Sequence, residues 1–368
     1  MTNSFKDLSK HFLNNEFGAI EDHDLGVRFL KLRSVSRKNT IKELCCLHNV
    51  ETDGKRSNIL FEEVFNNEVI TEDHIDSYIK EKYDEERSSR REQEDYLIDQ
   101  LNRLHAFNWG GSKGNSLEKN IVDNYVKKIK SYDQINEEIE SNLLSSLRGY
   151  TLNSWYNHWT SILIEDIFKD NQNVLPTVGL IKKVDFFICN IPFDLKVTYF
   201  PEQLMKEKLR DCGYGNELTR TKKICRNLNI HIPDDLKNEA LKSHLQGILK
   251  ERQDQRARNF IDELNYQKIE IINSSMNNPN ELKVWLYENQ GEMRFDASNR
   301  FFLILVNNTN LSESWKIKRN IVFLREKINE HLETLVQDSD SLTTRFHWSK
   351  NDTWYECKSD ILFINYQE

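Results

Sequence analysis

The most constraining feature of the sequence is one continuous apolar run, NRFFLILVNN, at residues 299–308. A run of strand length without polar alternation is typical of a strand that is buried on both faces of a sheet. Crossing a bilayer takes roughly 18 to 20 apolar residues, and no segment of the chain approaches that length. We therefore expect a sheet with a covered central strand and no membrane partner.

The first part of the chain is expected to be a mainly helical domain over residues 1–148. Apolar residues recur at helical spacing in EDYLIDQLNRLHAF and in SLEKNIVDNYVKKIKSYDQI. The charged run at residues 80–96 predicts a solvated helix or linker, with a contact surface as the alternative. The glycine-rich stretch at residues 109–114 predicts a turn-rich break between two helices.

The pattern changes after residue 150, where a second domain is expected over residues 149–368. A helix is predicted over 151–170, and two β-rich runs follow at 174–190 and 191–200, with a turn between them. Pro201 predicts the start of another helix. The remaining predicted elements are a helical insertion at about 211–298, the buried strand, a last helix at 312–336, and two short strands, TTRFHW and YECKSDILFI.

Charge and cysteine usage narrow the class of protein. The chain has 51 Lys+Arg against 59 Asp+Glu, a net charge of -8, which argues against a protein that coats nucleic acid without specificity. This net charge does not exclude a local basic cleft. The six cysteines form no CxxC pair, which disfavours a zinc ribbon or a disulfide framework and favours a reducing compartment. The first residues lack the apolar stretch of a signal peptide, so we expect a soluble cytoplasmic protein.

The segment VDFFICNIPFDLKVT, residues 184–198, carries the most informative chemistry. Side chains alternate along a strand, so Asp194 and Lys196 point to the same face. A tight hairpin brings Asp185, nine residues earlier, beside Asp194. Two carboxylates so near each other repel unless a cation neutralises them. Because oxygen ligands favour a hard metal, Mg²⁺ is the natural occupant. The alternative is that these are ordinary surface residues of a hairpin.

This pattern resembles the PD-(D/E)xK nuclease superfamily over about residues 150–310, with Asp185 as its first acid and Asp194-Leu195-Lys196 as its (D/E)xK motif. The resemblance implies a restriction-endonuclease-like core, an α/β (α+β) fold with a mixed sheet flanked by helices. Its element order is a helix, a three-stranded meander, a helix and a fourth strand, here Phe301 to Val306. Val184 stands where the family has proline.

The resemblance also implies roles for the site residues. Asp185 and Asp194 would bind Mg²⁺, and Lys196 would orient the attacking water and offset phosphate charge. Many family members carry a further acid on the first helix, for which this chain offers Glu165 as a third metal ligand; an exposed surface glutamate is the alternative. Five (D/E)xK tripeptides occur in the chain, so only the setting on a strand, next to a hairpin acid, distinguishes residues 194–196.

The substrate expected from these features is DNA. The stretch 206–226 has seven basic against three acidic residues, which predicts phosphate contacts, with a solvated helical surface as the alternative. The candidate DNA-binding residues are Lys206, Lys208, Arg220, Lys222, Lys223 and Arg226. Arg294, Asp296, Asn299 and Arg300 are candidates to support the site, with turn chemistry and helix capping as the alternative explanation. The expected function is a Mg²⁺-dependent restriction or phage-defence endonuclease acting as a homodimer. The alternative is a non-catalytic nucleic-acid-binding or scaffold protein with a nuclease-like core.

Overall fold

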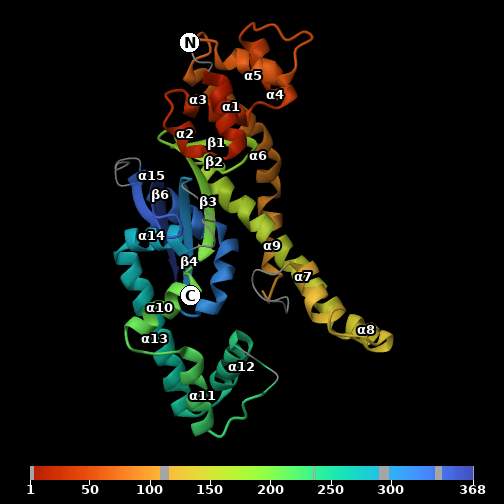
Figure 1. Cartoon of the computed structure of the whole chain (residues 1–368), viewed down its shortest axis with the longest axis vertical. Coiled ribbons are helices and arrows are strands. Elements are labelled where there is room, and N and C mark those ends of the chain that lie inside the picture. Colours follow the sequence, from red (N-terminus) through yellow and green to blue (C-terminus); the bar gives the residue numbers. More distant parts are fainter. Residues whose placement is uncertain are drawn as a thin grey trace.

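The fold is mixed α/β and is built around one six-stranded sheet (Figure 1). A computed structural model describes residues 4–107, 116–234, 236, 238–289, 298–335 and 342–367. The predicted break at 109–114 and the candidate residues Arg294 and Asp296 lie outside the described residues.

The strand order of the sheet is β1-β2-β3-β4-β6-β5. Strands β1 (Val174–Ile181), β2 (Val184–Ile188) and β3 (Ile191–Tyr199) form an antiparallel meander. Strand β4 (Arg300–Asn307) runs parallel to both β3 and β6 (Thr353–Tyr366), and β5 (Thr343–Trp348) closes the far edge antiparallel to β6. All eight residues of β4 are buried, which confirms the predicted strand. The first β-rich run is two strands rather than one.

Helices cover both faces of the sheet, and β4 divides its side chains between them. Phe301, Leu303 and Leu305 pack against α9 (Leu144–Lys169), the 3₁₀ helix η3 (Leu311–Arg319) and α15 (Ile321–Leu335). Phe302 and Ile304 face the other way, toward α10 (Glu202–Asp211), α13 (Gln255–Asn277) and α14 (Pro279–Asn289). This double cover explains why β4 has no polar alternation.

The N-terminal helices share a core with the sheet. They are α1 (Ser4–Asn14), α2 (Phe17–Glu21), α3 (Gly26–Ser34), α4 (Lys38–Leu47), α5 (Ser57–Phe65) and α6 (Glu72–Asn102). Their buried residues form one cluster with Val178 of β1 and Phe187 of β2. The predicted boundary at residue 148 falls within α9, which carries the chain unbroken into the sheet. Figure 1 shows the N-terminal helices stacked on the β1–β2 end.

The charged run at 80–96 lies inside α6 and is mostly exposed, as expected of a solvated helix, while some of its side chains contact the end of α9. Arg87 is only 1% exposed and donates hydrogen bonds to Asp170 at 3.0 Å and to Glu94 at 2.5 Å. Arg90 pairs with Asp166 at 2.8 Å. The run therefore joins two long helices through a buried charge network.

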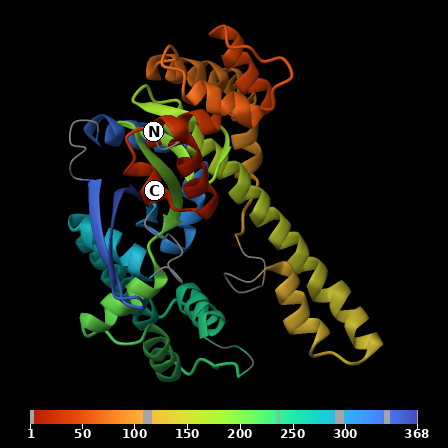
Figure 2. The same cartoon turned by 45° about the horizontal axis from the view of Figure 1, so that its top comes forward.

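Two helical parts extend away from the sheet. Helices α11 (Glu217–Asn227) and α12 (Asn238–Glu251) pack with α13 around a small core of their own. Helix α7 (Leu117–Ile121), the π-helical turns η1 (Val122–Val126) and η2 (Ile139–Leu143), and α8 (Tyr132–Glu138) form a hairpin with the start of α9 (Figures 1 and 2). Across the described residues, no helix combines the length and apolar character that crossing a membrane requires.

Candidate active site

The three residues of the predicted motif lie on one face of the β2–β3 hairpin. Phe186 pairs with Phe193 across the two strands, so the next positions, Asp185 and Asp194, are opposite each other. Both phenylalanines are fully buried on the α9 side. Because side chains alternate, Asp185, Asp194 and Lys196 share the opposite face.

The Asp185 carboxylate reaches across to β3. Its Oδ2 accepts a hydrogen bond of 2.7 Å from the backbone N–H of Leu195, the residue directly after Asp194. The backbone carbonyl of Asp185 accepts from the Thr177 hydroxyl at 2.7 Å, which ties β2 to β1. The carboxylate is therefore held next to Asp194 by the hairpin itself.

Two cations contact the Asp194 carboxylate. Lys196 pairs with Oδ1, and the Arg300 guanidinium pairs with Oδ2. Arg300 is the first residue of β4 and is the parallel-register partner of Asp194. Asp194 is 7% exposed and Arg300 3%. Burial lowers the pKa of Arg300 to about 10, and the negative charge of Asp185 opposes that change. Arg300 is thus charged and central to the site.

Glu165 lies on α9, the helix that packs on the Phe186 and Phe193 face of the hairpin. Its Oε1 forms an ion pair of 2.6 Å with Lys169, which also donates to the Thr177 carbonyl at 3.1 Å. Burial raises the pKa of the Glu165 carboxyl, and the Asp185 charge adds to that rise while Lys169 opposes it. The partner that Glu165 contacts directly is therefore Lys169.

The N-terminal helices also reach this cluster. The side-chain amide of Asn299, the residue before β4, donates to Glu21 of α2 at 2.7 Å. The Asn299 side-chain oxygen accepts from the backbone N–H of Lys358 on β6 at 2.7 Å. Asn299 and Arg300 are thus the two predicted supporting residues that the described chain places beside the motif.

The hairpin supplies two carboxylates, Asp185 and Asp194, as potential metal ligands. Among the described residues, no group of three His, Cys, Asp or Glu side chains is arranged to hold a metal ion. Mg²⁺ keeps several waters and is commonly bound through one or two carboxylates plus substrate phosphates. Asp185 and Asp194 supply two carboxylates from adjacent strands. A metal there would compete with the cations that already pair with Asp194.

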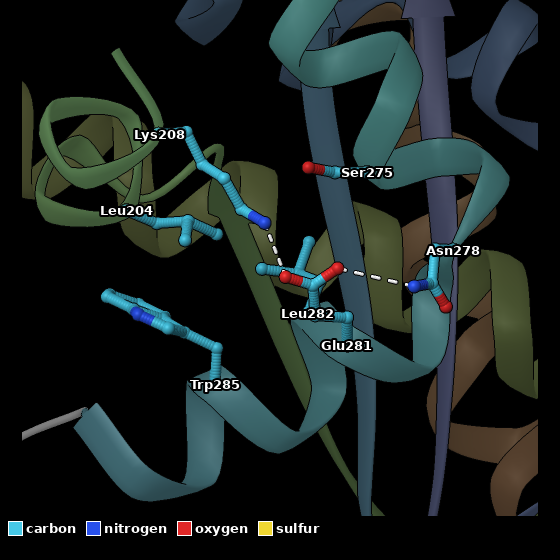
Figure 3. A pocket seen from close by; sticks show the side chains of 7 residues that line it. All are labelled: Leu204, Lys208, Ser275, Asn278, Glu281, Leu282 and Trp285. Atoms are coloured by element: carbon cyan, nitrogen blue, oxygen red, sulfur yellow. Dashed lines mark hydrogen bonds and ion pairs between the residues drawn. The ribbon is translucent and has the colours of Figure 1, made fainter. Parts of the chain in front are cut away.

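Three of the six predicted DNA-binding residues are paired with acidic side chains. Lys206 contacts Glu239 at 2.9 Å, and Arg220 contacts Glu263 at 3.0 Å. Figure 3 shows Lys208 pointing across a small hollow to Glu281, whose other oxygen accepts from Asn278 at 3.2 Å. For Lys222, Lys223 and Arg226, no ion pair joins them to another described residue. The first three are therefore largely neutralised.

The basic stretch is also separated from the carboxylates. Asp194 lies near the start of β3, whereas α10 and α11 follow the end of that strand. Both views place α11 at the end of the molecule farthest from β1 and β2 (Figures 1 and 2). The predicted basic cleft around the acidic site is therefore not formed by these helices.

A different buried cation lies at the far end of β3. Lys318 of η3 is 6% exposed, and its ammonium donates to the Asn157 side chain at 3.0 Å and sits 5.5 Å from the centre of the Tyr199 ring. Burial lowers the pKa of Lys318 to about 8. The sequence marks Lys318 only as part of the basic segment SWKIKRN. Its burial could not be predicted, because only the tertiary fold brings η3, α9 and β3 together.

Comparison with family models, curated proteins and solved structures finds no match to this chain.

Proposed function

We propose that this protein is a Mg²⁺-dependent deoxyribonuclease whose active site is the face that carries Asp185, Asp194 and Lys196. The observation that carries the proposal is the pairing of Phe186 with Phe193, which puts Asp185 and Asp194 at the next facing positions, together with the bond from the Leu195 N–H to Asp185 Oδ2. The order of elements supports it. Helix α9, the β1–β3 meander, helices α10 to α14 and the parallel strand β4 follow the order expected from the resemblance to PD-(D/E)xK nucleases.

Each residue of the site has a role that its position allows. Asp185 and Asp194 would hold Mg²⁺ together with substrate phosphates. Glu165 is the further acid on α9, but it pairs with Lys169 and does not form a three-ligand group with the two aspartates in the described structure. A metal held there would polarise a phosphodiester and lower the pKa of a coordinated water. Lys196 extends from the same face, where it orients the attacking water and offsets phosphate charge. Arg300 positions Asp194 from the neighbouring strand.

The biological role we propose is restriction or phage defence in the cytoplasm, an extension that rests on the resemblance. Cleavage of both strands of a duplex needs two such sites, which favours a homodimer. Among the predicted DNA-binding residues, Lys222, Lys223 and Arg226 would bind phosphates remote from the cleaved bond, because α11 is distant from the carboxylates.

One observation favours a second candidate, a non-catalytic nucleic-acid-binding or scaffold protein. Arg300 already neutralises the carboxylate that a metal would need. In a protein that uses this cluster only to stabilise its fold, the buried pair of Asp194 and Arg300 would be permanent.

Cleavage of plasmid DNA separates the two candidates. The nuclease proposal predicts cleavage with Mg²⁺, none with EDTA, and a loss of about a hundredfold or more in Asp194→Asn and Lys196→Ala. Glu356→Gln is the matched control, because Glu356 belongs to another (D/E)xK tripeptide on a strand and forms only an exposed ion pair with Arg345. Full activity in Asp194→Asn would refute the assigned site.

Metal binding distinguishes an inactive scaffold from a nuclease whose required DNA sequence is absent from the plasmids tested. Titration calorimetry with Mn²⁺ as the probe should detect binding to the wild type and none to Asp185→Asn or Asp194→Asn. Absence of binding in the wild type, together with no cleavage of any plasmid, would support the scaffold.

A further inference from the structure

A helical hairpin projects from the body of the molecule, and we call residues 116–150 the arm (Figures 1 and 2). Its first limb, residues 116–130, contains α7 and η1. Its second limb, residues 131–150, contains α8, η2 and the first turns of α9, in one helical stretch that begins at Tyr132 and continues to Lys169.

The arm has almost no core of its own. Asn120 is its only buried residue, and none of its apolar side chains is buried. Several large apolar side chains are exposed, led by Tyr132 at 79% and Val126 at 61%, with Leu144 and Leu147 on the second limb. Most helical stability in proteins comes from packing an apolar face, because short helices are marginal in water. The arm lacks that packing within the described chain.

The two limbs carry opposite charge. In residues 116–130, Lys119, Lys127, Lys128 and Lys130 stand against Glu118 and Asp123, so the first limb has a net charge of 4 − 2 = +2. In residues 131–150, Arg148 stands against Asp133, Glu137, Glu138 and Glu140, so the second limb has 1 − 4 = −3. The ion pair seen in the arm, Lys127 with Asp123 at 2.8 Å, lies within the first limb. Within the described chain, no ion pair joins the two limbs.

We propose that the arm docks against the arm of a second copy of this chain, which makes it the dimerisation element. A two-fold axis brings the same surface of two subunits together, so that surface must complement itself. Two adjacent hairpins meet this requirement when the basic limb of each lies along the acidic limb of the other. DNA is a poor partner, since the acidic limb would face its phosphates.

The size of the arm is sufficient for a weak dimer. The second limb has 20 residues, so its length is about 30 Å, and two adjacent helices are about 20 Å wide. One face of the arm is therefore about 600 Å², and a dimer would bury about 1,200 Å² in total, at the lower end of specific interfaces. We expect dissociation in the micromolar range. This inference does not depend on the proposed nuclease activity, and it is tested without DNA cleavage.

Charge reversal with a heterodimer rescue tests the inference. The variant that makes both limbs acidic is Lys127→Glu/Lys128→Glu/Lys130→Glu. The variant that makes both limbs basic is Asp133→Lys/Glu137→Lys/Glu140→Lys. In sedimentation velocity, the wild type should be dimeric at about 50 µM, and each variant alone should be monomeric. An equimolar mixture should form a heterodimer, because the acidic limbs of one variant face the basic limbs of the other.

Lys222→Glu/Lys223→Glu/Arg226→Glu is the matched control, since it changes net charge by the same amount on α11, away from the arm. It should remain dimeric, and circular dichroism should show unchanged helix content in all variants. A monomeric wild type at about 50 µM, or two variants that fail to form a heterodimer, would overturn the proposal. So would a limb variant that stays dimeric but loses affinity for a DNA duplex.

Discussion

Lys318 should make the stability of this protein increase with pH above neutrality. Burial lowers its pKa from 10.5 to about 8 in the folded chain. Below about pH 8 the lysine is charged in both the folded and the unfolded state, and the fold bears the full cost of burying the charge. Between the two pKa values only the unfolded state is protonated, so folding becomes more favourable as pH rises. Above the pKa of the unfolded state, the lysine is neutral in both states, and folding no longer bears the cost of burying a charge.

The size of the effect follows from the two pKa values. Their difference, 10.5 − 8, corresponds to about 3 kcal/mol of unfolding free energy at neutral pH. About 2 kcal/mol of this cost should disappear between about pH 7 and about pH 9.5. Burial is the cause of the lowered pKa, whereas Asn157 and the Tyr199 ring contact the ammonium and stabilise its charged form.

The assay is chemical unfolding of the wild type and Lys318→Met at a series of pH values. The difference in unfolding free energy between the two proteins isolates Lys318, because the other titrating groups are common to both. Lys316→Met, on the same helix and paired with Glu313 at 2.7 Å, controls for the loss of one positive charge. A difference between wild type and Lys318→Met that stays constant from about pH 7 to about pH 9.5 would refute the reasoning.

Two further substitutions test packing and the buried charge network. A Cβ at Gly26 would lie 1.7 Å from the carbonyl oxygen of Ile20, so Gly26→Ala should lower the unfolding free energy by about 3 kcal/mol; Gly18→Ala, with nothing within 4 Å of the added carbon, should not show this loss. Arg87→Met leaves buried carboxylates without their cation and should cost about 3 to 5 kcal/mol in thermal or chemical unfolding, whereas Arg91→Met, at a side chain 49% exposed, should cost less than about 1 kcal/mol.

The strands that could be predicted from the sequence are those with a local pattern. Strand β4 coincides with the apolar run at 299–308, because burial on both faces leaves no place for a polar residue. The turn between β1 and β2 was missed, since its residues are Lys182 and Lys183 rather than glycine or asparagine. Lys183 adopts a φ of +64°, a conformation that lysine seldom favours and that sequence gives no reason to expect.

The parts of the site that could not be predicted depend on contacts between distant segments. The hairpin placed Asp185 beside Asp194 because only a few residues separate them. Arg300 lies more than a hundred residues later, and its contact with Asp194 follows from the parallel register of β3 and β4. In the same way, nothing in the run at 80–96 distinguishes the buried Arg87 from the exposed Arg91, because their difference is imposed by α9.

The two cations on Asp194 differ in a way that matters for the proposed nuclease. The Arg300 side chain is 3% exposed and starts a strand whose residues are all buried, whereas the Lys196 side chain is 37% exposed. Moving a partly exposed lysine into solvent costs little, since water replaces its ion pair. Removing a buried arginine would leave an uncompensated charge in the core. If a metal were to bind Asp194 in the proposed nuclease, Lys196 would therefore be the cation displaced toward a phosphate, while Arg300 would stay and hold the carboxylate. Arg300→Met should consequently weaken folding more than Lys196→Met does.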